Sequence, residues 1–138
     1  MTLETTKSAV QRWHTMLQNS DMSMLSELLA NDVVFRSPVA YQPYVGKQVV
    51  FFILTNVIQV FENFTYHREF YTEDGENVVL EFSANVSGKS LKGIDMVRFN
   101  GQGKIIDFEV MIRPMSGLAA LAEQMGARFA QYQPNASQ

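Results

Sequence analysis

Asp95 is the residue whose position in this sequence points most directly to chemistry. It lies in the apolar segment 94–105, where strand-like alternation places it on one face with Val97 and Phe99. An acid is disfavoured in such a strand. On a core-lining face its carboxyl group must therefore be hydrogen-bonded, neutralised or used for chemistry. Burial also favours the neutral form of a carboxyl group. Asp95 is therefore the candidate catalytic residue, and its alternative role is that of a structural acid bonded to Trp13 or to a buried tyrosine.

Other residue types that carry chemistry are sparse. The chain has no cysteine, which excludes disulfides, thiolate metal sites and cysteine nucleophiles. His67 and Glu69 share a strand face, but with only two histidines and no clustered third ligand we expect no metal site. No glycine-rich phosphate loop and no nucleophile elbow is present, so we expect no cofactor. The net charge of -3 is spread without basic clusters, which argues against a nucleic-acid partner.

Length and hydropathy predict one domain over residues 1–138. A chain of 138 residues with 46% hydrophobic content can form a hydrophobic core without stabilising cross-links. Residues 1–7 are polar and lack a signal core. The longest apolar run, 49–54, is far shorter than the roughly 20 residues of a membrane span. We therefore expect a cytoplasmic protein with no membrane partner. Residues 131–138 are expected to form a frayed, disordered tail.

Hydrophobic periodicity predicts four helices and five strands. The expected helices are Thr5–Gln18, Met22–Ala30, Lys47–Glu62 and Met115–Ala130, and the expected strands are Val33–Ser37, Phe64–Tyr71, Val78–Ser87, Ser90–Asn100 and Lys104–Arg113. Ser20 or Asp21 can cap the second helix. This order indicates the α+β class: a curved antiparallel sheet wrapped around the N-terminal helices to form a cone, plus a C-terminal helix. The mouth of such a cone can hold a small molecule.

The last predicted strand has two different faces. Its apolar face consists of Ile106, Phe108, Val110 and Ile112, and its opposite face consists of Ile105, Asp107, Glu109, Met111 and Arg113. The mixed face is expected to be wet or covered by a partner. In the first helix, His14 is turned about 100° from Trp13, which favours a surface or interface position.

Three segments resemble a known family. They are Gln11 to Leu17, Asp32 to Val39, and Ile94 to Lys104. The chain is similar to the nuclear transport factor 2-like, or SnoaL-like, superfamily, and within it to bacterial ketosteroid isomerase. In that isomerase an aspartate is the general base, while a tyrosine and a protonated aspartic acid donate hydrogen bonds to the enolate oxygen.

The resemblance implies a similar pocket with altered chemistry. The protonated acid matches Asp95, the tyrosine position is occupied by Trp13, and the base position, just before Pro38, is occupied by Ser37. An unactivated serine cannot take a proton from carbon, so we expect no steroid isomerisation by that route. Trp13 keeps an indole N–H donor. The loop that carries Tyr41 and Tyr44 rims the mouth of the cone in this family.

Three hypotheses of function follow. The first is a binder of an apolar, carbonyl-type small molecule; the second is an isomerase or cyclase in which Asp95 is the acid or base; the third is a protein-interaction module with a filled cone. The expected ligand-binding residues are Trp13, Ser37, Tyr41, Tyr44, Phe99, Phe108 and Ile112. Because related cones pair through their sheets, we also expect a homodimer.

Overall fold

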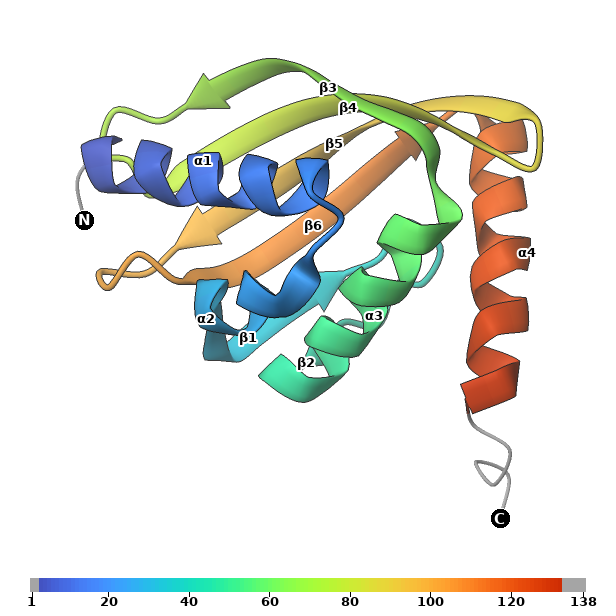
Figure 1. The fold of residues 1–138 in the computed structure, drawn as a ribbon, viewed down its shortest axis with the longest axis horizontal. Helices are drawn as coiled ribbons and strands as arrows, with labels where there is room; N and C mark the ends of the chain where they lie inside the picture. Colours follow the sequence, from blue (N-terminus) through green and yellow to red (C-terminus); the bar gives the residue numbers. More distant parts are fainter. Residues whose placement is uncertain (1–2, 133–138) are drawn as a thin grey trace.

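The computed structural model describes residues 3–132, which form a six-stranded sheet and the helices packed on it (Figure 1). The elements, in chain order, are α1 (Leu3–Gln18), η1 (Met22–Met24), α2 (Leu25–Leu28), β1 (Leu29–Arg36), β2 (Tyr44–Val45), α3 (Lys47–Val60), β3 (Glu62–Tyr71), β4 (Asn77–Val86), β5 (Lys89–Phe99), β6 (Ile105–Arg113) and α4 (Met115–Tyr132). The predicted tail begins inside α4, and its residues 133–138 lie outside the described residues. Within the described part, no helix is both long and apolar enough to cross a bilayer.

The sheet is mixed, with the strand order β2-β1-β6-β5-β4-β3. Strands β3 to β6 form an antiparallel meander, as expected, but β1 pairs parallel with β6. The expected curved sheet is therefore present, with one parallel pairing that makes it mixed. Hydrophobic periodicity marks a segment as a strand, but the direction of two strands from opposite halves of the chain is set by no local turn.

The inward faces of β4 and β5 were predicted correctly. In β4 the inward residues Val78, Leu80, Phe82, Ala84 and Val86 are all buried. In β5 Asp95, Val97 and Phe99 are buried, while Met96 and Arg98 between them are exposed. Alternation along these strands therefore carries Asp95 into the concave side of the sheet.

A bulge at the start of β6 corrects the predicted position of Ile105. Arg98 pairs with Asp107, but its neighbour Phe99 pairs with Ile105, so β6 holds one extra residue, Ile106, at this point. Ile105 is consequently 3% exposed and belongs to the core, although simple alternation had placed it on the outer face with Met111.

The predicted helix over residues 22–30 is shorter than expected. It consists of η1 and α2 and ends at Leu28, with Asp21 as the cap through its Oδ1 atom, which accepts from the Ser23 N–H. Leu29, which pairs with Ile105, already belongs to β1. Pairing with β6 thus overrides the helical pattern of these residues.

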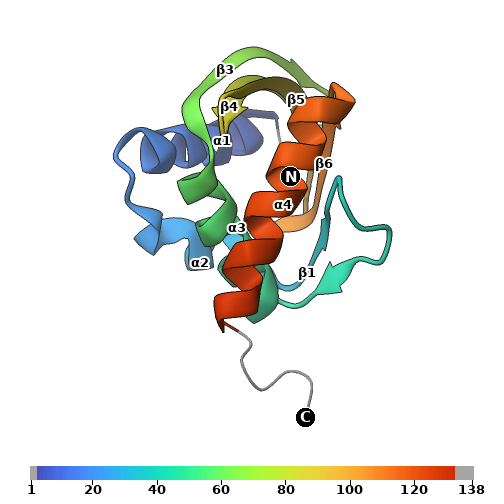
Figure 2. The same cartoon turned by 90° about the vertical axis from the view of Figure 1, so that its right-hand side faces the viewer.

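Helices α1 and α3 cover the concave side of the sheet, and α4 lies beside α3 at one end of it (Figures 1 and 2). The inner face of α4 buries Leu121 and Met125. Phe129 stacks on Phe52 of α3 with ring centroids 5.7 Å apart. Nη1 of Arg128 donates to the side chain of Asn56 at 2.9 Å. These contacts hold the C-terminal helix against α3.

Candidate functional site

Asp95 lies in the middle of β5, with Leu80 of β4 and Val110 of β6 as its neighbours. It is 5% exposed among apolar side chains. This burial raises the pKa of Asp95 from its ordinary value of 3.8 to about 7, and a hydrogen bond from Tyr66 opposes the rise. At neutral pH the carboxyl group is thus close to half protonation, which suits a group that gives or takes a proton.

A chain of two hydrogen bonds connects Asp95 to Trp13. The hydroxyl of Tyr66, on β3, donates to Oδ2 of Asp95 at 2.6 Å. The Nε1–H of Trp13, on α1, donates to the same hydroxyl at 2.8 Å. Burial and the neighbouring carboxyl group raise the pKa of Tyr66 well above its usual range, so the phenol keeps its proton. The ring of Trp13 packs against Phe108 at 5.4 Å and fixes the indole.

The direction of these hydrogen bonds determines what the site can do. Trp13 and Tyr66 each use their one proton within the chain. Among the described residues Tyr66 is the one hydrogen-bond partner of Asp95, and its bond goes to Oδ2. The carboxyl group can therefore offer a proton to a ligand oxygen when neutral, or accept a proton when ionised.

The cavity beside Asp95 is small and apolar. Its volume is about 40 Å³, which is room for water but far below the roughly 300 to 1,000 Å³ of a typical ligand pocket. Its lining comprises Trp13, Phe35, Pro38, Leu54, Val57, Ile58, Phe61, Phe64, Tyr66, Phe82, Asp95, Phe108, Val110, Ile112 and Leu121. Asp95 is the only carboxylate in this lining, and no histidine belongs to it.

A second pocket of about 170 Å³ lies between the β1–β2 loop, α3 and α4. Ser37 and Tyr44 line it, together with Met125 and Phe129 of α4. Oγ of Ser37 accepts a hydrogen bond from the Val39 N–H at 3.1 Å. Four residues line both this pocket and the Asp95 cavity: Phe35, Pro38, Val57 and Leu121. This outer pocket is thus separated from Asp95 by one layer of side chains.

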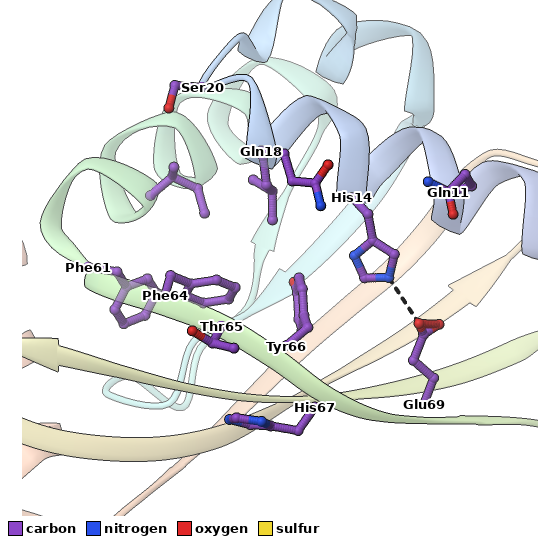
Figure 3. A pocket seen from close by; sticks show the side chains of 12 residues that line it. Gln11, His14, Gln18, Ser20, Phe61, Phe64, Thr65, Tyr66, His67 and Glu69 are labelled. Atoms are coloured by element: carbon purple, nitrogen blue, oxygen red, sulfur yellow. Dashed lines mark hydrogen bonds and ion pairs between the residues drawn. The ribbon is translucent and has the colours of Figure 1, made fainter.

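A much larger hollow than the space at Asp95, about 580 Å³, is an open groove between α1 and β3 (Figure 3). His14 and Glu69 face each other across it, with Nε2 and Oε2 3.0 Å apart. The ring of His14 also packs edge-on against Tyr66 at 4.9 Å. His14 is therefore part of the groove wall.

A bulge in β3 brings Glu69 into this groove. Tyr66 pairs with Phe82, but Glu69 pairs with Leu80, so the strand has one extra residue between these two pairs. Glu69 consequently lies on the inner side of the sheet, whereas His67 bonds to Ser83 on the outer side. The prediction that His67 and Glu69 share a strand face was wrong. The described residues hold no group of three side chains suited to a metal ion.

The structure separates the predicted site residues into three groups. Trp13, Phe108 and Ile112 line the cavity with Asp95. Ser37 and Tyr44 line the outer pocket. Phe99 packs in the core, and Tyr41 is 99% exposed in its loop.

Sequence reasoning did not identify Tyr66 as the partner of Asp95. The available signal was its position in a predicted strand, two residues after Phe64 on the same face. The groove residues His14 and Glu69 were likewise not predicted as a pair, because the bulge that unites them leaves no mark on the hydrophobic pattern.

Comparisons with known proteins agree with the fold. A model of the SnoaL-like domain matches residues 10–108. A steroid delta-isomerase from Pseudomonas aeruginosa is 52% identical, with a TM-score of 0.91 over 94% of this chain and 95% of its own. An uncharacterized protein with a cystatin-like fold from Silicibacter pomeroyi is 35% identical, with a TM-score of 0.80 over 87% and 84% of the two chains.

More distant structures share the fold alone. A nuclear transport factor 2-like protein from Mesorhizobium loti is 19% identical, with a TM-score of 0.71 over 80% of this chain and 93% of its own. No match was found among curated proteins. Since the family model covers most of the chain and a 52% identical relative covers nearly all of it, the protein belongs to the SnoaL-like domain family.

Proposed function

We propose that this protein binds an apolar small molecule through a carbonyl oxygen that accepts a hydrogen bond from Asp95. The observation that carries the proposal is the chain from Trp13 through Tyr66 to Asp95 at the centre of an otherwise apolar cavity. Buried polar groups are expensive, so a carboxyl group whose Oδ1 atom has no hydrogen-bond partner among the described residues favours a ligand rather than a filled core.

The raised pKa of Asp95 supports a donor role. With a pKa of about 7, a large fraction of the carboxyl groups is neutral at physiological pH and can donate to a ligand oxygen. The same property makes the carboxyl group in ketosteroid isomerases a hydrogen-bond donor. A relative that is 52% identical and bears the name steroid delta-isomerase supports a flat, steroid-like ketone as the ligand class.

Binding without steroid isomerisation is the better-supported activity. No second carboxylate lines the cavity, and Ser37, at the position of the isomerase base, lines the outer pocket instead. Its hydroxyl oxygen accepts from the Val39 N–H, and among the described residues no hydrogen bond from this hydroxyl to a base is found. The site thus offers one acid and two further polar groups, but no separate base.

A second candidate is proton transfer by Asp95 alone. A carboxylate with a pKa of about 7 can take a proton from the carbon next to a carbonyl and return it to another carbon of the same face. The two candidates require opposite protonation states of Asp95, and this difference makes them separable.

The test uses the fluorescence of Trp13, the only tryptophan of the chain. We expect a β,γ-unsaturated steroid ketone to change this fluorescence, and the hydrocarbon of the same skeleton to bind more weakly. Affinity for the ketone should fall as the pH rises through about 7, because the proton donor is lost. Asp95→Asn should abolish this pH dependence.

Product analysis in the same titration separates the remaining hypotheses. Turnover that rises with pH through about 7 would favour proton transfer by ionised Asp95 over binding alone. No fluorescence change between pH 5 and 9 with either compound would contradict both, and would favour a protein-interaction module, with which the small volume of the cavity is consistent.

A further inference from the structure

One layer of side chains separates the buried Asp95 cavity from the open groove beside α1. The residues that line both spaces are Ile58, Phe61, Phe64 and Tyr66. Trp13 and Asp95 line the cavity but not the groove, whereas His14 and Glu69 line the groove but not the cavity. A molecule in the groove is therefore separated from Trp13 and Asp95 by this wall of shared residues.

Tyr66 is the central residue of the wall. Its hydroxyl lies between Trp13 and Asp95, at 2.8 and 2.6 Å, and so fills the position from which a ligand oxygen could contact both. Its ring packs edge-on against Phe64 at 4.8 Å and against His14 at 4.9 Å. The phenol thus occupies the place of a ligand oxygen and closes the cavity toward the groove.

The strand that carries Tyr66 is the least supported wall of the cavity. β3 is an edge strand whose only sheet neighbour is β4. Its ladder is interrupted by register shifts on both sides of Tyr66, and Asn63 has a φ of 55°. An edge strand with bulges makes fewer backbone hydrogen bonds. Fewer of these bonds must therefore break if the strand shifts and lets a side chain rotate outward.

The opposite wall, at α4, is held more firmly. Leu121 and Met125 are buried there, and Arg128 donates both to Asn56 at 2.9 Å and to Gln59 at 2.8 Å. Gly117 packs so closely on β5 that an added Cβ would lie 2.7 Å from Cβ of Leu91. Movement of α4 would break all of these contacts at once.

We propose that the groove between α1 and β3 is the access route and outer subsite for the ligand, with Tyr66 as the gate whose hydroxyl the ligand oxygen replaces. The identity of the ligand in this proposal rests on the proposed function, whereas the access route does not. Phe61 and Phe64 offer flat surfaces on the β3 side of the groove, and Gln11, Gln18 and Ser20 offer polar groups on its α1 side (Figure 3). The matching ligand is a flat ring ketone that also carries a hydroxyl group.

The pair of His14 and Glu69 holds the gate closed. His14 packs on the ring of Tyr66, and its Nε2 is fixed by Oε2 of Glu69 (Figure 3). Oε1 of Glu69 in turn accepts from the Tyr71 hydroxyl at 2.9 Å. Loss of the His14 ring should let Tyr66 swing outward more often.

A first experiment needs no ligand. Because the chain has one tryptophan and no cysteine, a maleimide label on a single introduced cysteine can block one route while acrylamide quenching of Trp13 reports access. Gln18→Cys places the label in the groove. Gly126→Cys places it in the outer pocket beneath α4, where an added Cβ meets no atom within 4 Å.

We expect the groove label to lower the quenching constant at least about twofold and the label at residue 126 to leave it unchanged. His14→Ala should raise quenching. The matched control His67→Ala should not, because His67 also lines the groove but its imidazole bonds to Ser83 rather than packing on Tyr66. The proposal would be overturned if the label at residue 126 lowered the quenching constant, whether or not the groove label did so as well. It would also be overturned if neither label lowered the quenching constant.

A second experiment measures association of a 3-keto steroid that carries a distal hydroxyl group. The groove label should slow its association about tenfold, and Tyr66→Phe, which removes the competing hydroxyl but keeps the ring, should bind it more tightly. The role of Tyr66 as a gate would be overturned by equal association rates with and without the groove label, or by weaker steroid binding to Tyr66→Phe. Absence of binding by unlabelled protein would count against the proposed function, while the quenching result would still decide the route.

Discussion

The hydroxyl of Tyr66 donates to Asp95 across 2.6 Å, although the two residues come from strands that are separated in the sheet by β4. The bond places a phenol and a carboxyl group with a pKa of about 7 in one apolar space. Stability, ligand affinity and activity should therefore all depend on the protonation of Asp95.

The first prediction concerns stability and pH. The folded state keeps a proton on Asp95 between about pH 4 and pH 7, whereas the unfolded state releases it, because the pKa is raised from 3.8 to about 7. The free energy of unfolding should therefore fall as the pH rises through this window, by about 4 kcal/mol at most. Urea denaturation of wild type and Asp95→Asn at several pH values measures the difference, and parallel curves would contradict the raised pKa.

The second prediction concerns the missing base. The Ser37→Asp, Trp13→Tyr double variant should turn over a β,γ-unsaturated ketone where the parent does not, since a positioned base contributes about a hundredfold or more. Addition of Asp95→Asn should lower the rate again. If the parent is already as active as the double variant, Ser37 does not mark a missing base.

The third prediction concerns α4. Leu121 is 3% exposed and lines both the cavity and the outer pocket, so Leu121→Ala should lower the free energy of unfolding by about 2 to 5 kcal/mol. The control Gln124→Ala removes only a bond to Ser87 at the surface and should cost about 1 kcal/mol or less. Thermal and urea unfolding check both variants. Equal losses of unfolding free energy in the two variants would mean that the packing of α4 does not stabilise the domain.

The fourth prediction concerns assembly. The outer face of the sheet exposes Met96 by 40% and Met111 by 45%, and ion pairs such as Arg36–Asp107, 3.2 Å apart, surround them. We expect this face to form a twofold dimer, as a patch that pairs with itself. Met111→Asp should therefore yield a monomer, while Tyr41→Asp, in the exposed loop, should not. Light scattering at micromolar concentration decides, and a monomeric wild type would refute the dimer.

The sequence was sufficient for the fold class and for the face on which Asp95 lies. The inward positions of β4 and β5 recur at every second residue, so the burial of Val78 and Phe99 follows from period-two spacing, although Glu81 on the other face of β4 is buried too. The two bulges could not be predicted in this way. An extra residue leaves the order of apolar and polar side chains unchanged, yet it reverses the face of everything beyond it, as at Ile105 and Glu69.

The candidate site was predictable in part. Asp95 and Trp13 were identified from the carboxylate in an apolar strand and from the family resemblance, and both line the cavity. Tyr66 was not identified, because several tyrosines precede Asp95 in the chain and only tertiary packing determines which one reaches it. Tyr41 was expected near a ligand, but its loop projects into solvent.

The parallel pairing of β1 with β6 also has a consequence for folding kinetics. The meander from β3 to β6 is joined by short turns and forms from local contacts, whereas the β1–β6 ladder must bring together the two halves of the chain. Closure of such a long loop loses entropy before any contact compensates for it. We therefore expect the meander to form early in refolding and β1 to dock late, so that the hydrophobic contacts between Phe35 and Phe108 report the last step of the reaction.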